Sequence, residues 1–339
     1  MEDILTRKLW AIGGGKGGVG KSIITLLLGD RLAKLGAKVI LVDADLGGAN
    51  LNILLGIRYP LHTLEDFIHK RVDYLEDALT STPMQNLKLL CGADDILGIA
   101  NPKFVQKKRI LDHLKRLEAD IILLDLGAGT SFTTMDFFLY AVNKVVVLSP
   151  QVTSIQNAYG FIKSCMYRKF SRVFSKDAEA LQLIQNAISD KEKKVESIPE
   201  LKKTLQSLGQ ERELLLSSCF DDMKPGIIVN MIRNEKERNV AKVVHDVSEK
   251  YLDISPESLG FVDYDPLLEK SINKMESFLM GGKSNSATTQ VYDIAMKILK
   301  RTPKETGKIH PPVNRIQRER RITFTNTKAL SNAPQIAHA

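Results

Sequence analysis

A glycine-rich segment near the start of the chain carries lysine and serine at a spacing that suits phosphate binding. Residues 13–22 read GGGKGGVGKS and satisfy the pattern G-x-x-x-x-G-K-[ST]. Because glycine lacks a Cβ, successive backbone N–H groups can turn inward around phosphate oxygens. Lys21 can then reach the β- and γ-phosphates of a nucleotide, and the Ser22 hydroxyl can bind Mg²⁺. The predicted loop residues are Gly15, Lys16, Gly17, Gly18, Val19, Gly20, Lys21 and Ser22. A flexible glycine loop without a ligand is the alternative.

Two later segments place aspartates directly at the ends of apolar runs. Residues 43–50 read DADLGGAN, and residues 123–129 read LLDLGAG. A carboxylate at the carboxyl end of a strand, close to Mg²⁺ and a γ-phosphate, can orient an attacking water or hold a metal-bound one. For the first segment, a capped turn between a strand and a helix is the alternative without chemistry.

The elements around these segments follow a repeated strand–helix order. Short apolar runs separated by helical patterns occur at 8–15, 38–45, 87–92, 120–127, 144–150, 226–232 and, more weakly, 258–264. Such runs are typical of strands that helices cover on both faces. The pattern predicts an α/β fold with a doubly wound, mostly parallel sheet. Ligands of such sheets bind at the carboxyl ends of the strands, where the motifs lie.

The alternation of strand and helix patterns predicts one nucleotide-binding domain over residues 1–300, and a helical insertion interrupts this domain at about 165–224. The insertion is charged and has no strand pattern; Pro199 suits a first helical turn. Leu201, Leu205 and Leu208 form one helical stripe that Gly209 ends. Residues 301–339 form a basic tail that we expect to be disordered in isolation.

Composition and charge exclude several functions. Hydrophobic residues make up 43% of the 339 residues and charged residues 26%, and the net charge is +8. Of this charge, +6 lies in residues 301–339, so the remaining chain is nearly neutral. No apolar run approaches the roughly 20 residues that span a bilayer, and the first residues do not resemble a signal peptide. The three cysteines lie far apart, which favours the cytoplasm and argues against a metal cluster.

A second lysine at the start of the loop, Lys16 in KGGVGKS, carries a family resemblance. With it, most of residues 8–300 outside the insertion resembles the MinD/ParA family of P-loop ATPases with a deviant Walker A motif. The resemblance implies a Mg²⁺-dependent ATPase that binds ATP and ADP and forms a homodimer when ATP is bound. In the family the extra lysine reaches the ATP of the facing subunit, which gives Lys16 a catalytic role in trans beside Lys21 and Asp45.

The same resemblance assigns the remaining site residues. Asp45 matches the aspartate that positions the attacking water, and Asp43 matches the one nearer the metal. Asp125 is expected to reach Mg²⁺ through water, together with Ser22 as a direct ligand. Gly129 is expected near the γ-phosphate and Asn230 at the adenine, although Asn230 can also be an ordinary turn residue.

Three details favour the FlhG branch, also called YlxH or FleN, which regulates flagellar number. These are DADLG-x-AN, the later VDYDP at 262–266, and D-x-G-A-G, in which Gly127 replaces the usual proline. Two features of the branch are not matched: its amino-terminal helix with a D-Q-A motif, for which only MEDILTR precedes the first predicted strand, and the 165–224 segment, which is unlike ordinary FlhG or MinD. In the wider family the loop that packs on adenine carries a proline where this chain has Asp263.

The resulting expectation is an ATPase switch that hydrolyses ATP slowly and controls the position or number of a cellular structure. We expect a cytoplasmic protein that binds a protein partner, flagellar or FlhF-like, with peripheral association at the inner membrane face as a further expectation. A ParA-like DNA- or cargo-partitioning ATPase is the alternative, which the nearly neutral body disfavours. The stripe Val291, Ile294, Ala295, Ile298 and Leu299 can form a membrane-binding helix, but a final core helix is the favoured interpretation.

Overall fold

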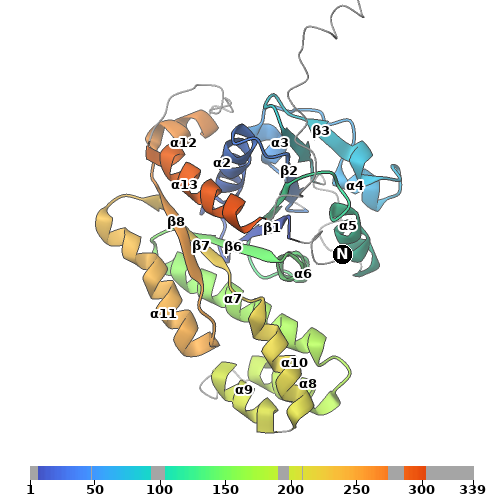
Figure 1. The fold of residues 1–339 in the computed structure, drawn as a ribbon, viewed down its shortest axis with the longest axis vertical. Coiled ribbons are helices and arrows are strands. Elements are labelled where there is room, and N and C mark those ends of the chain that lie inside the picture. The colour runs from blue at the N-terminus through green and yellow to red at the C-terminus, as the bar shows by residue number, and fades with distance from the viewer. Residues whose placement is uncertain are drawn as a thin grey trace, which may run out of the picture. The chain divides into compact units, whose positions relative to one another are not determined.

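The computed structural model describes residues 7–46, 48–92, 104–189, 198–207, 209–273 and 286–302. Within them, eight strands form one sheet in the order β3-β4-β2-β5-β1-β6-β7-β8, and all neighbours are parallel except β3 and β4 (Figure 1). The strands are β1 Leu9–Gly13, β2 Val39–Ala44, β3 Leu79–Ser81, β4 Leu87–Leu90, β5 Ile121–Leu126, β6 Asn143–Leu148, β7 Gly226–Ile232 and β8 Glu257–Asp263. The predicted α/β class with a doubly wound, mostly parallel sheet is confirmed.

The apolar character of the strands follows from burial on both faces of the sheet. In β1, Leu9 and Ala11 belong to one hydrophobic cluster, whereas Trp10 and Ile12 belong to the other. Successive side chains of a strand point to opposite faces, so a strand covered on both sides must be apolar throughout. All seven predicted strands are present. The missed strand, β3, is short and partly exposed, and therefore has no apolar run.

Two groups of helices cover the two faces (Figure 1). On one face lie α2 (Lys21–Lys34), α3 (Leu51–Leu54) and α13 (Ser286–Arg301). On the other lie α4 (Leu64–Ile68), α5 (Phe104–Leu114), α6 (Phe132–Tyr140), α7 (Val152–Val173) and α11 (Val240–Leu252). The short helices η1 (Leu75–Ala78), η2 (Glu235–Asn239) and α12 (Pro266–Asn273) complete this part of the chain.

Helix α13 is part of the core. Val291, Ile294, Ala295 and Ile298 are each at most 1% exposed and pack with residues of α2 and the sheet. The indole nitrogen of Trp10 in β1 donates a hydrogen bond to the Thr302 hydroxyl just after α13, at 3.2 Å. The favoured interpretation of the stripe as a core helix is therefore confirmed.

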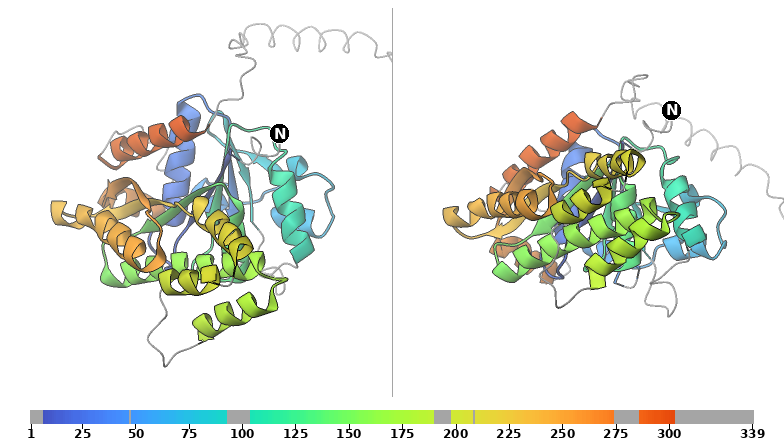
Figure 2. Two further views of the ribbon diagram at one scale, coloured as in Figure 1. Left: turned by 60° about the horizontal axis from the view of Figure 1, so that its bottom comes forward. Right: turned by 90° about the horizontal axis from the view of Figure 1, so that it is seen from below.

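Helices α8 (Ala178–Ser189), α9 (Ile198–Ser207) and α10 (Gln210–Asp221) follow α7 and lie at its carboxyl-terminal half (Figures 1 and 2). Pro199 lies in the first turn of α9, as predicted, and Leu201 and Leu205 are buried. Leu208 lies outside the described residues. These helices share one hydrophobic cluster with α6 and α7.

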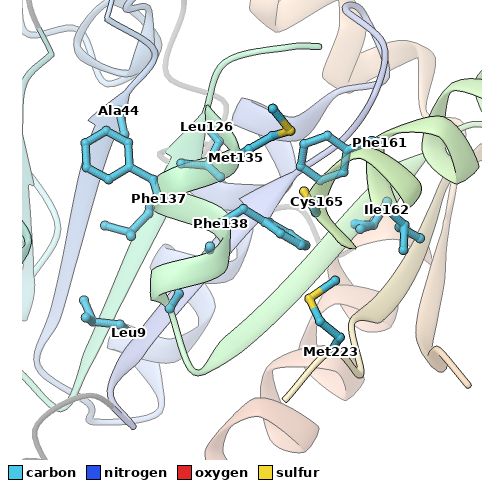
Figure 3. Packing of buried hydrophobic residues seen from close by; sticks show 14 of the residues in the cluster. Leu9, Ala44, Leu126, Met135, Phe137, Phe138, Phe161, Ile162, Cys165 and Met223 are labelled. Atoms are coloured by element: carbon cyan, nitrogen blue, oxygen red, sulfur yellow. The ribbon is translucent and has the colours of Figure 1, made fainter. Parts of the chain in front are cut away.

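The predicted insertion boundary at 165 falls inside the continuous helix α7. Figure 3 shows Cys165 among Phe138, Phe161 and Ile162, in the core beside the sheet. That residues 165–224 form an insertion separable from a 1–300 domain stays a prediction. Most of the predicted tail, residues 303–339, lies outside the described residues. Among the described helices, none has both the length and the apolarity needed to cross a membrane.

Candidate functional site

The glycine-rich loop connects the end of β1 to the start of α2, at the carboxyl edge of the parallel strands. Gly18 and Gly20 have φ angles of 77° and 84°, in the left-handed region that favours glycine. At position 15 a side chain would not fit, since a Cβ there would lie 1.9 Å from the backbone oxygen of Asn157 in α7. The loop is therefore shaped by its own backbone and by close packing against α7.

Lys21 begins α2 and is only 8% exposed. Burial lowers the pKa of its ammonium group, while the carboxylates of Asp125 and Asp45 raise it. Its Nζ lies 3.5 Å from the backbone oxygen of Lys16. A desolvated cation at a helix amino terminus, with the loop around it, suits the phosphate groups of a nucleotide.

Asp43 and Asp125 are direct neighbours across the β2–β5 pair. Both are almost fully buried, and burial raises the pKa of Asp43 to about 6 and that of Asp125 to about 7. Asp43 accepts hydrogen bonds from the backbone N–H groups of Asn50 (2.9 Å) and Leu51 (3.0 Å). These bonds hold the loop after β2 against the strand that carries Asp43.

Asp125 accepts hydrogen bonds from the hydroxyls of Ser22 and Thr25, the latter at 3.1 Å. Ser22 and the two carboxylates thus form a compact set of oxygen donors, the kind of donor that Mg²⁺ prefers. No group of three or more His, Cys, Asp or Glu suited to a metal occurs among the described residues. Mg²⁺ typically takes one or two carboxylates from a protein and completes its shell with phosphate and water. The cysteines are free and buried.

Asp45 and the loop after β5 close the phosphate end of the site. The Asp45 carboxylate raises the pKa of Lys21 through its negative charge and lies directly beside Gly127. Gly129, with a φ of 84°, donates its N–H to the backbone oxygen of Gly14 at 3.4 Å. The structure therefore brings Lys21, Ser22, Asp43, Asp45 and Asp125 together, as the sequence predicts.

Two predicted residues contact their own chain. Lys16 donates hydrogen bonds from Nζ to the Gln151 side-chain oxygen (3.2 Å) and the Thr153 hydroxyl (2.9 Å), at the start of α7. Asn230 in β7 is buried, and its Nδ2 donates to the backbone oxygen of Val19 at 2.9 Å. Asn230 thereby supports the glycine-rich loop; its contact with adenine stays a prediction.

Sequence reasoning missed three contributors. Thr25 lies one helical turn after Lys21, so helical spacing could have placed it beside the site. Gln151 and Thr153 carry no comparable signal, because their role depends on the contact between the glycine-rich loop and the start of α7, which are far apart in the chain.

The fold and these side chains define an α/β protein whose site suits phosphate groups and a divalent cation. A model of the CobQ/CobB/MinD/ParA nucleotide binding domain matches residues 10–278. The chain belongs to this family, and the predicted MinD/ParA resemblance is confirmed.

The relatives include FleN and YlxH. The chain is 24% identical over 291 residues to the antiactivator FleN of Pseudomonas aeruginosa, and the match covers 85% of each chain. It is 34% identical over 191 residues to the flagellum site-determining protein YlxH of Helicobacter pylori, and this match covers 54% of this chain and 58% of YlxH. These relatives agree with the predicted similarity to the FlhG branch.

Solved structures of MinD share the fold. The cell division ATPase MinD of Pyrococcus furiosus superposes with a TM-score of 0.59 at 20% identity and covers 86% of this chain and 98% of its own. MinD of Pyrococcus horikoshii, solved with Mg-ADP, has a TM-score of 0.59 at 19% identity, with coverage of 90% and 99%.

Proposed function

We propose that this protein is a Mg²⁺-dependent ATPase that works as a switch between an ATP-bound dimer and a released state. The convergence of Lys21, Ser22, Asp43, Asp45 and Asp125 at the glycine-rich loop carries the proposal. The loop amides and Lys21 bind the phosphates, while Ser22, Asp43 and Asp125 hold the cation directly or through water. Bound Mg²⁺ would neutralise charge on the phosphate oxygens. Asp45 orients the water that attacks the γ-phosphate.

Dimerisation is supported by Lys16 and by the surface around it. Lys16 is bonded to exposed polar side chains rather than to its own phosphate site. Val152, between its two partners, is 70% exposed. In this proposal its apolar side chain faces a second copy of the chain, and Lys16 completes the partner's nucleotide site.

The cellular role that we propose is control of flagellar position or number. Its relative YlxH is named a flagellum site-determining protein, which supports this role. The nearly neutral body of this chain disfavours the alternative, a DNA-partitioning ATPase of ParA type. The protein acts in the cytoplasm with a protein partner, and the basic tail favours contact with an anionic membrane surface.

Nucleotide binding and hydrolysis by two variants test the proposal. Lys21→Ala should weaken ATP binding by about 100-fold or more, since it removes the buried charge at the phosphates. Asp45→Ala should keep ATP binding but lower kcat by about 100-fold or more, because it removes the group that orients water. Calorimetric binding and phosphate release provide the two measurements.

Lys34→Ala is the matched control, since Lys34 lies on the same helix, outside the site, and pairs with Asp30 at 2.8 Å. It should bind and hydrolyse ATP like the wild type. Folded wild-type protein that does not bind ATP at millimolar concentration would refute the proposed function.

A further inference from the structure

The Asp45 carboxylate is enclosed by glycines from two different loops. A Cβ built on Gly127, in the loop after β5, would lie 2.6 Å from Oδ1 and 3.0 Å from Cγ of Asp45. A Cβ built on Gly48, in the loop after β2, would lie 3.2 Å from Oδ2. Asp45 can occupy its position because residue 127 has no side chain.

The backbone at Gly127 does not itself require glycine. Gly129 has a φ of 84°, but neither Gly127 nor Gly48 belongs to the glycines with positive φ. An alanine could adopt the same backbone at both positions, so what glycine supplies there is space. In this respect Gly127 differs from Gly18, Gly20 and Gly129, whose conformation favours glycine.

The atom that an added methyl group would meet is the end of a rotatable side chain. Rotation of Asp45 about its side-chain bonds relieves such a contact at low cost. The fold should therefore tolerate Gly127→Ala, while the carboxylate moves away from the loop after β5. Because Asp45 lies within electrostatic range of Lys21, this movement shifts it relative to the phosphate end of the site.

We propose that Gly127 is a positioning residue for ATP hydrolysis: its missing side chain lets the Asp45 carboxylate lie against the loop after β5, where it orients water. This inference rests on the proposed ATPase function.

Gly127→Ala tests the inference by separating turnover from binding. We expect kcat for ATP to fall by roughly 10- to 100-fold, the cost of a catalytic group displaced by about 1 Å. The Kd for ADP and the melting temperature should stay close to those of the wild type. Gly160→Ala is the matched control, because a Cβ at this position of α7 meets no atom within 4 Å; its kcat should be unchanged.

Two further variants connect the effect to Asp45. Gly48→Ala makes a weaker contact with the same carboxylate, so its loss of kcat should be smaller; it also carries the test if Gly127→Ala folds poorly. In the Asp45→Ala background, Gly127→Ala should cause no additional loss of the residual rate, because the two changes act through one group.

The outcomes are distinguishable. A wild-type protein without ATPase activity would overturn the proposed function and this inference with it. An active wild type whose kcat changes less than about twofold in Gly127→Ala would overturn the positioning role alone. Additive losses in the double variant, or equal losses of kcat and ADP affinity, would also overturn it.

Discussion

Asp43 and Asp125 set the expected pH dependence of the site. Burial raises the pKa of Asp43 to about 6 and that of Asp125 to about 7; the Asp45 carboxylate adds to the increase at Asp43, and the Asp43 carboxylate adds to that at Asp125. Because these pKa values are higher in the folded chain than the ordinary value of 3.8, protonation of the two carboxyl groups stabilises the ligand-free fold. This contribution is complete at a pH below 3.8 and is lost as the pH rises through about 6 to 7. A divalent cation needs the charged carboxylates and so competes with these protons.

The affinity for Mg²⁺ in the presence of ADP should consequently rise between pH 6 and pH 8. For a single group with a pKa of about 7, linkage gives a change of about tenfold over this range. Titrations of ADP binding against Mg²⁺ at several pH values measure it. Binding of ADP in EDTA is the control and should vary much less; an identical pH dependence with and without Mg²⁺ would contradict this account.

The site residues could be predicted to the extent that each motif is local. The loop at 13–22 and the aspartates at 43, 45 and 125 follow from short patterns, because the strands before them end at one edge of the sheet. The space around the Asp45 side chain could not be predicted, since Asp45 and Gly127 lie in loops that follow two different strands, β2 and β5. Only the folded arrangement shows that a side chain at 127 would meet this carboxylate.

At the scale of elements, the start of α7 and the glycine-rich loop are connected through Lys16. Its hydrogen bonds to Gln151 and Thr153 hold the lysine on its own chain. If Lys16 completes the site of a second copy, these bonds must break when the dimer forms. In the proposed switch they would therefore oppose dimerisation.

Thr153→Val should strengthen the ATP-dependent dimer. Both protomers lose one hydrogen bond of about 0.5–1.5 kcal/mol, so the protein concentration at half-dimerisation should fall by about five- to 150-fold. Sedimentation velocity over a range of concentrations measures this shift. Thr204→Val on α9 is the matched control, because the Thr204 hydroxyl donates a hydrogen bond to the backbone oxygen of Glu200 in its own helix, at 3.1 Å. An unchanged or weaker dimer in Thr153→Val would reject the opposing role.

Element boundaries are where sequence reasoning was least reliable. The predicted insertion starts at 165 because the strand rhythm stops near that point, yet α7 runs without interruption from Val152 to Val173. Its apolar side chains pack on the sheet and its polar side chains follow the helical period, so no local signal marks a domain boundary. The strand β3 was missed because a short, partly exposed strand has no pattern of its own.

At the scale of the whole molecule, the class of fold could be predicted but the strand order could not. Apolar runs alternating with helical patterns indicate a parallel sheet covered on both faces. The order β3-β4-β2-β5-β1-β6-β7-β8 depends on which strands pair across long crossovers, for which the chain carries no local signal. This order places β1 between β5 and β6, so that the glycine-rich loop lies between the Asp125 loop and the start of α7.

The mass of the protein in solution with ATP and with ADP tests the central claim, the nucleotide-dependent dimer, most directly. Light scattering of the Asp45→Ala variant, which should retain ATP, is expected to show twice the monomer mass of 37.8 kDa with Mg-ATP. With Mg-ADP it should show the monomer, and adding Lys16→Ala should restore the monomer in Mg-ATP. One unchanged mass without nucleotide, with Mg-ADP and with Mg-ATP would contradict the switch.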